Sequence, residues 1–257
     1  MPVRNERWPA GTPCWVDLGT PDVEASQTFY GAVLGWEFGD TGEDFGHYLV
    51  ARRDGSTVAG MMTPPGADET PAAWTTYLAS DAINATAEAI TAAGGSVLYP
   101  PMQVGPLGWM LIAQDDQGVL FGAWQADQMI GMQLTNDPGS VGWNQCMTKD
   151  PGAAQAFYAK VFGYRYTPLE GETDYATIDG AGPGNTVGGM GSRGADAAAG
   201  QSPGWDTYFT VSDADAVVTA IEQRGGRIVS GPDPTPFGRM LDAVDPHGAA
   251  FSLAEVT

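Results

Sequence analysis

The sequence repeats itself at half its length. The first copy begins with Trp15-Val16-Asp17-Leu18 and continues to Phe29-Tyr30, and the second begins with Trp143-Asn144-Gln145-Cys146 and continues to Phe157-Tyr158. Both landmarks are 128 positions apart (143 − 15 and 157 − 29). Because solenoid repeats have far shorter periods, a self-match at this distance indicates two copies of one small module.

The correspondence continues to the ends of both copies, with only short insertions. Further matching segments are Val58–Met61 with Val187–Met190, Trp74–Leu78 with Trp205–Phe209, Gly94–Gly95 with Gly225–Gly226, and Asp115–Gly118 with Asp245–Gly248. We therefore predict two modules, residues 1–130 and 131–257, each long enough to bury a hydrophobic core of its own.

Each copy is predicted to begin with a strand and a helix. In the first copy the strand covers Cys14–Gly19 and the helix Ala25–Leu34, with Asp22 as its N-cap and Gly35 ending it. In the second copy Asp150-Pro151 has the entry role, with proline just inside the helix start.

Further strands lead to a second helix in each copy, at Ala82–Ala93 and at Ala214–Arg224. Two last strands then join through the turns that begin at Asp115 and Asp245. The pattern predicts an α+β fold of tandem modules, in which each half repeats a β-α-β-β unit.

Alternation along the first strand separates two faces. Val16 and Leu18 suit the side that the helices cover, so Trp15 and Asp17 point the other way. The same reasoning in the second copy directs Trp143 and Gln145 away from the helices. We expect these side chains to line a cup formed by the sheet.

Composition excludes several classes of function. The net charge of −20, from 31 acids and 11 bases, repels nucleic acid and suits a cationic ligand, although it also fits a merely solvated surface. No run of residues approaches the ~20 apolar positions of a membrane span, and the first residues lack the apolar core of a signal peptide. We expect a cytoplasmic protein without a membrane partner, in which Cys14 and Cys146 are buried reduced thiols.

The order of these motifs resembles the vicinal oxygen chelate superfamily, which includes glyoxalase I, bleomycin-resistance proteins and extradiol dioxygenases. The resemblance rests on Asp22, Phe29-Tyr30, Leu34-Gly35-Trp36, Gly94-Gly95 and Asp115–Gly118, and on Asp150, Phe157-Tyr158, Phe162-Gly163-Tyr164, Gly225-Gly226 and Asp245–Gly248 in the second copy. It covers residues 11–256 and is nearest to a two-module branch common in actinobacteria. It implies βαβββ units that pair edge to edge and curve their sheets around a small molecule.

The resemblance also locates the positions where metal-using members carry their ligands. The first histidine position falls on Trp15 and Trp143, the second on Thr75 and Asp206, and the glutamate position on Gly122 and Ser252. A catalytic divalent ion needs about three histidine or carboxylate ligands, and only Asp206 qualifies. We therefore expect neither a metal nor another cofactor.

Polar side chains in an aromatic cup are the candidates for chemistry. Asp17 and Asp206 are the predicted catalytic residues, because a carboxyl group among aromatic rings has a raised pKa and exchanges protons. The predicted substrate-binding residues are Trp15, Trp143, Gln145, Tyr77, Tyr208, His47, Trp109 and Arg239. The alternatives are structural, with the aspartates bonded to tyrosine or backbone and the tryptophans serving as core packing.

Three functions fit this pattern. The first is a metal-independent enzyme that acts on an aromatic or polycyclic secondary metabolite by acid–base chemistry. The second is a protein that sequesters a drug without catalysis, as bleomycin-resistance proteins do, for which a small, possibly cationic aromatic ligand would be the partner. The third is a metal-dependent lyase or dioxygenase. Either a monomer or a homodimer is compatible with two modules in one chain.

Overall fold

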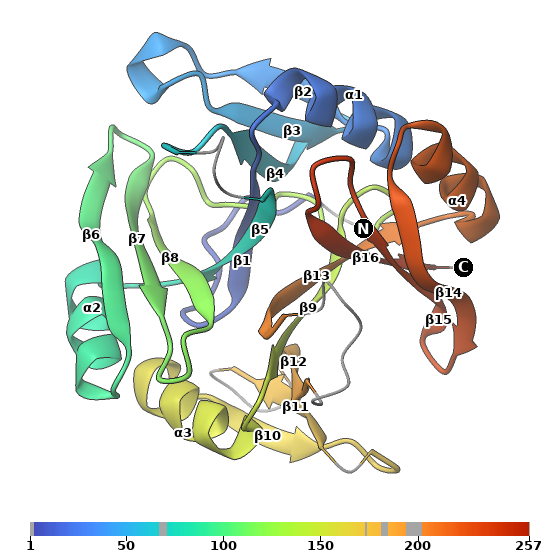
Figure 1. Ribbon diagram of the computed structural model, residues 1–257. Helices are drawn as coiled ribbons and strands as arrows, with labels where there is room; N and C mark the ends of the chain where they lie inside the picture. The colour runs from blue at the N-terminus through green and yellow to red at the C-terminus, as the bar shows by residue number, and fades with distance from the viewer. Residues whose placement is uncertain (1–2, 67–70, 173, 181–184, 194–201, 257) are drawn as a thin grey trace.

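The computed structural model describes residues 3–66, 71–172, 174–180, 185–193 and 202–256, and it contains one strongly curved eight-stranded sheet in each half of the chain (Figure 1). The spatial order in the first sheet is β2 (Glu37–Asp40), β3 (Leu49–Arg53), β4 (Ser56–Met62), β1 (Pro13–Gly19), β5 (Ala73–Ala79), β8 (Leu120–Ala126), β7 (Gly108–Gln114) and β6 (Ser96–Val104). The second sheet has the same order: β10 (Arg165–Pro168), β11 (Tyr175–Asp179), β12 (Thr186–Ser192), β9 (Val141–Thr148), β13 (Gly204–Val211), β16 (Ala250–Glu255), β15 (Gly238–Val244) and β14 (Arg227–Thr235).

Each sheet is built from two βαβββ units that meet at a central antiparallel pair. That pair is β1 with β5 in the first sheet and β9 with β13 in the second. The helices within the units are α1 (Val23–Leu34), α2 (Ile83–Ala92), α3 (Pro151–Phe162) and α4 (Ala214–Gln223), and a short 3-10 helix, η1 (Glu43–Phe45), lies between β2 and β3. The predicted α+β fold of tandem βαβββ modules is confirmed.

The β-α-β-β pattern read from the sequence misses one strand in every unit, the strand that directly follows the helix. In the first half these strands are β2 and β6. Both lie at the edges of the sheet and expose most of their residues, so they lack the alternation of apolar and polar residues that marks a half-buried strand.

The helix boundaries follow from local chemistry. The Asp22 carboxylate accepts a hydrogen bond from the Ala25 amide at the start of α1, and Asp150 does the same for Ala153 in α3. α1 ends at Gly35, whose φ of 69° lies in the left-handed region where a side chain would be strained. The predicted capping roles of Asp22 and Gly35 are confirmed.

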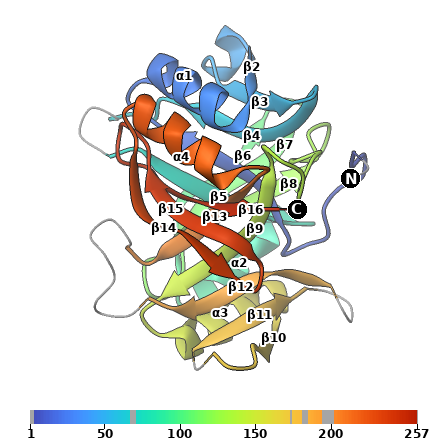
Figure 2. The same ribbon diagram turned by 90° about the vertical axis from the view of Figure 1, so that its right-hand side faces the viewer.

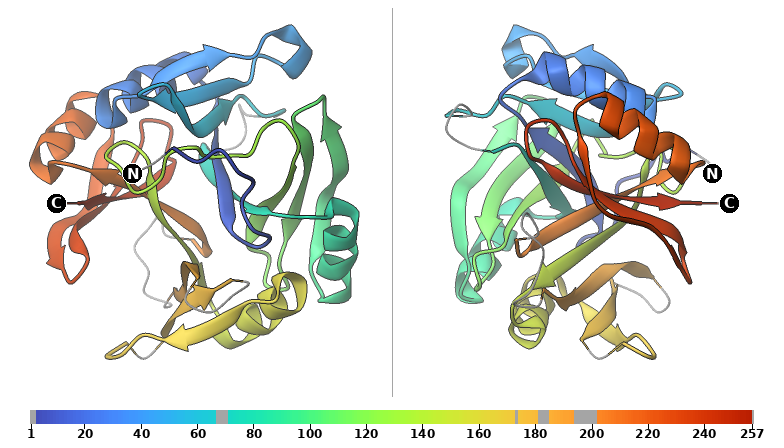
Figure 3. Two further views of the ribbon diagram at one scale, coloured as in Figure 1. Left: turned by 180° about the vertical axis from the view of Figure 1, so that it is seen from behind. Right: turned by 45° about the vertical axis from the view of Figure 1, so that its right-hand side comes forward.

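The two halves are held together by their helices. α1 packs beside α4 (Figures 1 and 2), and α2 packs beside α3 (Figures 1 and 3). The buried Tyr30 hydroxyl donates to Asp245 across the interface at 3.1 Å and accepts from Trp74 at 3.1 Å. Tyr158 repeats this role with Trp205 and Asp115. The recurring Phe-Tyr pairs and Asp-x-x-Gly turns therefore join the two halves.

None of the helices in the described residues has the length and apolar character that crossing a membrane requires.

Candidate functional site

The strand register places several polar and aromatic side chains on the sheet face that points away from the helices, here called the inner face. In the first sheet Trp15 pairs with Tyr77 and Tyr77 with Gly122, while Asp17 lies between Gly60 and Thr75. The corresponding positions of the second sheet are Trp143, Tyr208, Ser252, Gln145, Gly189 and Asp206. The expected direction of the first-strand side chains agrees with this arrangement, since Val16 and Leu18 are wholly buried on the other side.

The N-terminal inner face holds a compact hydrogen-bonded cluster. Asp17 Oδ2 accepts from the hydroxyls of Tyr48 at 3.2 Å and Tyr77 at 3.1 Å, and Trp15 Nε1 donates to Tyr48 at 2.8 Å. Trp15, Asp17 and Tyr77 are at most 6% exposed. Burial raises the pKa of Asp17 to about 6, although its two tyrosine bonds act in the opposite direction.

Glycines allow these rings to fill the N-terminal inner face. A side chain at Gly122 would collide with the ring of Tyr77, and one at Gly60 would collide with the hydroxyl of Tyr48. At the rim, the ring of Phe45 approaches Gly105 in the turn between β6 and β7. The N-terminal inner face is thus largely occupied by its own side chains.

The C-terminal inner face carries a related but half-exposed network. Gln145 Nε2 donates to Tyr208 at 3.1 Å and to Asp206 Oδ2 at 3.4 Å. Gln145 Oε1 accepts from the hydroxyl of Tyr175 at 2.9 Å, and that hydroxyl accepts from Trp143 Nε1 at 3.1 Å. All five side chains are only partly buried, which leaves them accessible to a ligand.

Arg193 adds a positive charge to this network. Its Nη2 lies 2.6 Å from Asp206 Oδ1 and 2.5 Å from Oδ2, and the two side chains are 12% and 24% exposed. Burial raises the pKa of Asp206, and the Arg193 guanidinium limits that rise. The second inner face therefore contains a guanidinium–carboxylate pair where the first has a lone carboxyl group.

Sequence reasoning missed three residues of these clusters. Tyr48 and Tyr175 stand 127 positions apart (175 − 48), so the repeat itself could have identified them. Arg193 occupies the position of Pro64 in the first copy (193 − 64 = 129, the offset of the Val58 and Val187 match). An arginine at a position where the first copy has proline could therefore have identified this residue from the sequence.

Three predicted substrate-binding residues lie apart from both networks. Trp109 packs against the helix-side core, and Arg239, on the same side of its sheet, pairs with Asp215 at 2.8 Å and Glu255 at 3.2 Å. His47 was expected on an inner strand, but β3 begins at Leu49, and His47 lies in an exposed turn at φ 56° beside Asp40. The alternation of side chains along a predicted strand did not place these three residues correctly, because their positions depend on where each strand begins and on its register with its neighbours.

The residues at the family's metal positions do not fit a metal ion. The indole N–H of Trp15 donates to Tyr48, and the space beside Gly122 is filled by Tyr77. Asp206 is already paired with Arg193. Within the described ranges, no group of three or more histidine, cysteine, aspartate or glutamate side chains is arranged to hold a metal.

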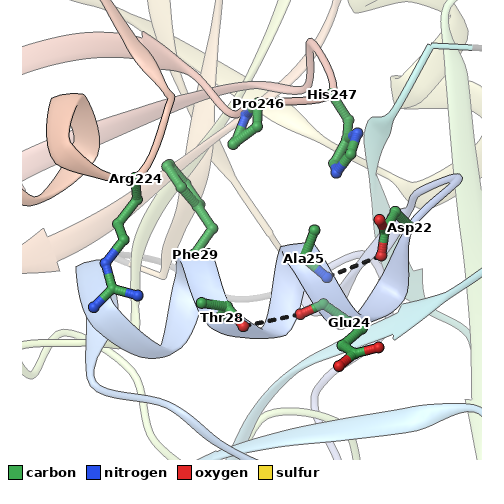
Figure 4. A pocket seen from close by; sticks show the side chains of 8 residues that line it. All are labelled: Asp22, Glu24, Ala25, Thr28, Phe29, Arg224, Pro246 and His247. Atoms are coloured by element: carbon green, nitrogen blue, oxygen red, sulfur yellow. Dashed lines mark hydrogen bonds between the residues drawn. The ribbon is translucent and has the colours of Figure 1, made fainter.

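A separate surface pocket of about 450 Å³ lies beside the first turns of α1 (Figure 4). Its lining consists of Asp22, Glu24, Ala25, Thr28, Phe29, Arg224, Pro246 and His247. At the equivalent position in the other half, the side chain of Gln117 forms hydrogen bonds with the backbone of Asp150 and with the hydroxyl of Thr148. The histidine that replaces this glutamine is directed toward α1 (Figure 4), and no chemistry follows from the pocket alone.

The fold and repeated units define the class of this protein. The chain belongs to the glyoxalase/bleomycin resistance protein/dioxygenase superfamily, whose family model matches residues 14–122 and 131–253. It is 38% identical over 268 residues to "Anthracycline biosynthesis protein DnrV" of Streptomyces peucetius, covering 97% of this chain and 95% of that protein. It is 35% identical over 264 residues to "Putative glyoxylase CFP32" of Mycobacterium bovis, covering 98% and 97%.

Solved structures share the fold at low sequence identity. A Mn(II)-bound glyoxalase from Novosphingobium aromaticivorans has a TM-score of 0.64 and 18% identity, covering 96% of this chain and 82% of that one. The 2,2',3-trihydroxybiphenyl 1,2-dioxygenase of Sphingomonas wittichii has a TM-score of 0.63 and 12% identity, covering 96% and 91%. At these identities the similarity concerns the fold alone.

Proposed function

We propose that this protein binds an aromatic or polycyclic secondary metabolite at the C-terminal inner face and transfers a proton on it without a metal ion. The observation that carries the proposal is the contrast between the two inner faces. Trp15 and Tyr77 are buried in the first sheet, whereas their counterparts Trp143 and Tyr208 are partly exposed in the second. Exposed hydrogen-bonding groups beside an indole ring are what a flat, oxygen-bearing ligand requires.

Each residue of the C-terminal face has a role in this proposal. Trp143 stacks on the ligand, and Tyr208 and Gln145 orient its oxygen atoms. Asp206 holds the guanidinium of Arg193, whose charge stabilises an oxyanion that forms during proton transfer. Asp206 takes part directly in proton transfer only if the ligand displaces Arg193 from one of its two oxygens.

The relatives support the chemical class of the ligand. The name of the Streptomyces peucetius relative refers to anthracycline biosynthesis, and its similarity extends over nearly the whole of both chains. A related protein of Streptomyces sp. strain C5 carries the same description at 37% identity. Metal independence rests on a different argument, the donor set at the inner faces described above.

Sequestration without catalysis is the second candidate function, and the net charge of −20 favours it for a cationic aromatic drug. The two functions differ in two measurable ways. An enzyme forms a product, whereas a sequestering protein returns its ligand unchanged. Binding driven by the acidic surface weakens as salt is raised.

The test compares an anthracycline with its neutral aglycone. Binding is followed by the quenching of ligand fluorescence, and proton transfer by the uptake of deuterium from D2O into the ligand's C–H positions, measured by mass spectrometry in the presence of EDTA. We expect both ligands to bind and Trp143→Phe and Tyr208→Phe to weaken binding, with the exposed Tyr99→Phe as the matched control. Conversion that needs an added metal ion would refute metal independence, and salt-sensitive binding of the cationic ligand alone, without product, would select sequestration.

A further inference from the structure

Three side chains form a row across the C-terminal inner face. Tyr208 on β13 pairs in register with Ser252 on β16, and Ser252 pairs with Asp242 on β15. The Ser252 hydroxyl donates to Asp242 Oδ1 at 2.7 Å and is also hydrogen-bonded to Tyr208. The row connects the half-exposed phenol of Tyr208 to a carboxylate two strands away.

The number of protons available fixes the direction of the hydrogen bonds in this row. A serine hydroxyl has one proton, and the proton of Ser252 points to Asp242. The bond between Tyr208 and Ser252 is therefore donated by the tyrosine. Gln145 Nε2 donates to the Tyr208 oxygen at 3.1 Å and so fixes the phenol from the opposite side. Tyr208 is held with its proton directed along the row.

Asp242 is fixed at the far end of the row. Ser230 on β14 donates to its Oδ2 at 2.8 Å, so both carboxylate oxygens accept a serine hydroxyl. The Asp242 side chain is partly exposed, which allows it to exchange protons with water. A carboxylate with these contacts is a suitable end point for a proton that leaves the inner face.

Among the described residues of the first half, the register-equivalent positions contain no such row. Its register equivalents are Tyr77, Gly122 and Ile112, which offer no hydroxyl and no carboxylate beyond the tyrosine. Tyr77 instead donates to Asp17 on the neighbouring strand. Asp17 thus lies on the β1 side of Tyr77, whereas Asp242 lies on the opposite side of the equivalent Tyr208, beyond β16.

We infer that Tyr208, Ser252 and Asp242 form a proton relay that serves a carbon acid bound at the C-terminal inner face. This inference rests on the proposed function and deepens it. Hydroxyl protons exchange with water unaided, whereas a C–H group beside a carbonyl needs a positioned base. The substrate class is therefore a fused-ring aromatic ketone with an acidic C–H group.

The proton balance is complete without any added reagent. The substrate C–H bond breaks, and its proton goes to the Tyr208 oxygen while the phenol proton passes to Ser252 and the serine proton to Asp242 Oδ1. The substrate becomes an enolate near Arg193, and Asp242 becomes a carboxylic acid. Return of the proton to the same or another carbon of the enolate restores the starting state of the relay.

The first experiment uses 2-tetralone, a minimal fused-ring ketone, and measures by NMR how fast its C1 protons exchange with D2O. We expect Ser252→Ala and Asp242→Asn to lower the protein-dependent exchange rate by a factor on the order of 100, as general-base catalysis commonly does. Ser252→Thr retains the hydroxyl and should restore most of the rate. Asp233→Asn, on the exposed strand β14, removes the same charge and is the matched control.

A second experiment needs no substrate. In protein labelled at tyrosine Cζ, Ser252→Ala and Asp242→Asn should shift the Tyr208 resonance, while Tyr77 in the other half serves as the internal control. An unmoved Tyr208 resonance, or equal exchange rates in Asp242→Asn and Asp233→Asn, overturns the relay. A shifted Tyr208 resonance in a protein that leaves 2-tetralone and the anthracycline aglycone unbound supports the hydrogen-bonded row and instead rejects the proposed function.

Discussion

The two inner faces of this protein began as the same surface and now differ in what occupies them. Both retain a tryptophan on the first strand, a tyrosine at the start of the third strand (Tyr48 directly before β3, Tyr175 in β11) and a tyrosine on the fifth strand, counted within each half. The N-terminal face buries Trp15 and Tyr77 around Asp17, whereas the C-terminal face leaves their counterparts partly exposed around Gln145. After duplication, the inner face of the first half is filled by packed side chains, while that of the second half remains a partly exposed polar surface.

A few exchanges at equivalent positions account for this divergence. Each gives the second half a polar or charged group: Thr75 corresponds to Asp206, Pro64 to Arg193, Gly122 to Ser252 and Ile112 to Asp242. The exchange of Asp17 for Gln145 runs the other way and removes a charge from the second half. The second half therefore lacks the carboxyl group of Asp17 and has carboxyl groups at two other positions, Asp206 and Asp242.

The largest expected effect concerns the pH dependence of stability through Asp17. Its pKa of about 6 in the folded protein lies above the ordinary 3.8, so its contribution to stability is full below about pH 4 and is lost as the pH rises through 6. The loss amounts to roughly 3 kcal/mol at ~1.4 kcal/mol per pH unit. Asp17→Asn should therefore unfold with a free energy that falls less between pH 4 and pH 7.

Chemical denaturation of both proteins at these two pH values measures this difference. Other aspartates with raised pKa values, Asp115, Asp206 and Asp245, are common to both proteins and cancel in the comparison. Parallel pH profiles for wild type and Asp17→Asn would show that the N-terminal inner face does not bury an ionisable group in the way described.

A smaller effect is expected where a side chain is added to the filled face. Gly122→Ala places a methyl group against the ring of Tyr77 and should destabilise the protein by about 2 kcal/mol, a typical cost of overpacking. The reverse change in the second half, Ser252→Gly, removes a buried hydroxyl that donates to Asp242 but forces no atoms into contact. Urea unfolding should show the larger loss for Gly122→Ala, and equal losses would contradict the difference in packing.

The sequence alone could predict the repeat, the helices, their caps and the family, because each depends on local spacing or on motifs that recur. It also directed Asp17 and Tyr77 toward the inner face of the first half, and Gln145, Asp206 and Tyr208 toward that of the second, and within each face the structure joins them by hydrogen bonds. It did not show that one face is filled and the other open. Part of that difference depends on Gly122 beneath the ring of Tyr77, a position that is Ser252 in the second half, and this is a contact between strands distant in sequence.

Arg239 illustrates a limit of reasoning from the repeat. It breaks the pattern by replacing Trp109, as Arg193 does by replacing Pro64, and from the sequence both changes suggest a site. The structure separates them: Arg193 is largely buried beside Asp206, whereas Arg239 is 37% exposed on the helix side beside Asp215. A departure from symmetry identifies a changed residue, but only the strand register shows which face has changed.

The smallest expected effect follows from this separation. Arg239→Met removes two ion pairs, with Asp215 and Glu255, which solvent screens because Arg239 itself is 37% exposed, so thermal stability and ligand affinity should both stay close to wild type. Arg193→Met leaves the Asp206 carboxylate partly buried without its partner, so the pKa of Asp206 should rise and binding of the anthracycline aglycone should weaken. Calorimetric titration of both variants distinguishes the two arginines. If Arg239→Met lowers affinity more than Arg193→Met does, the ligand lies on the helix side of the sheet, and the C-terminal inner face is not its site.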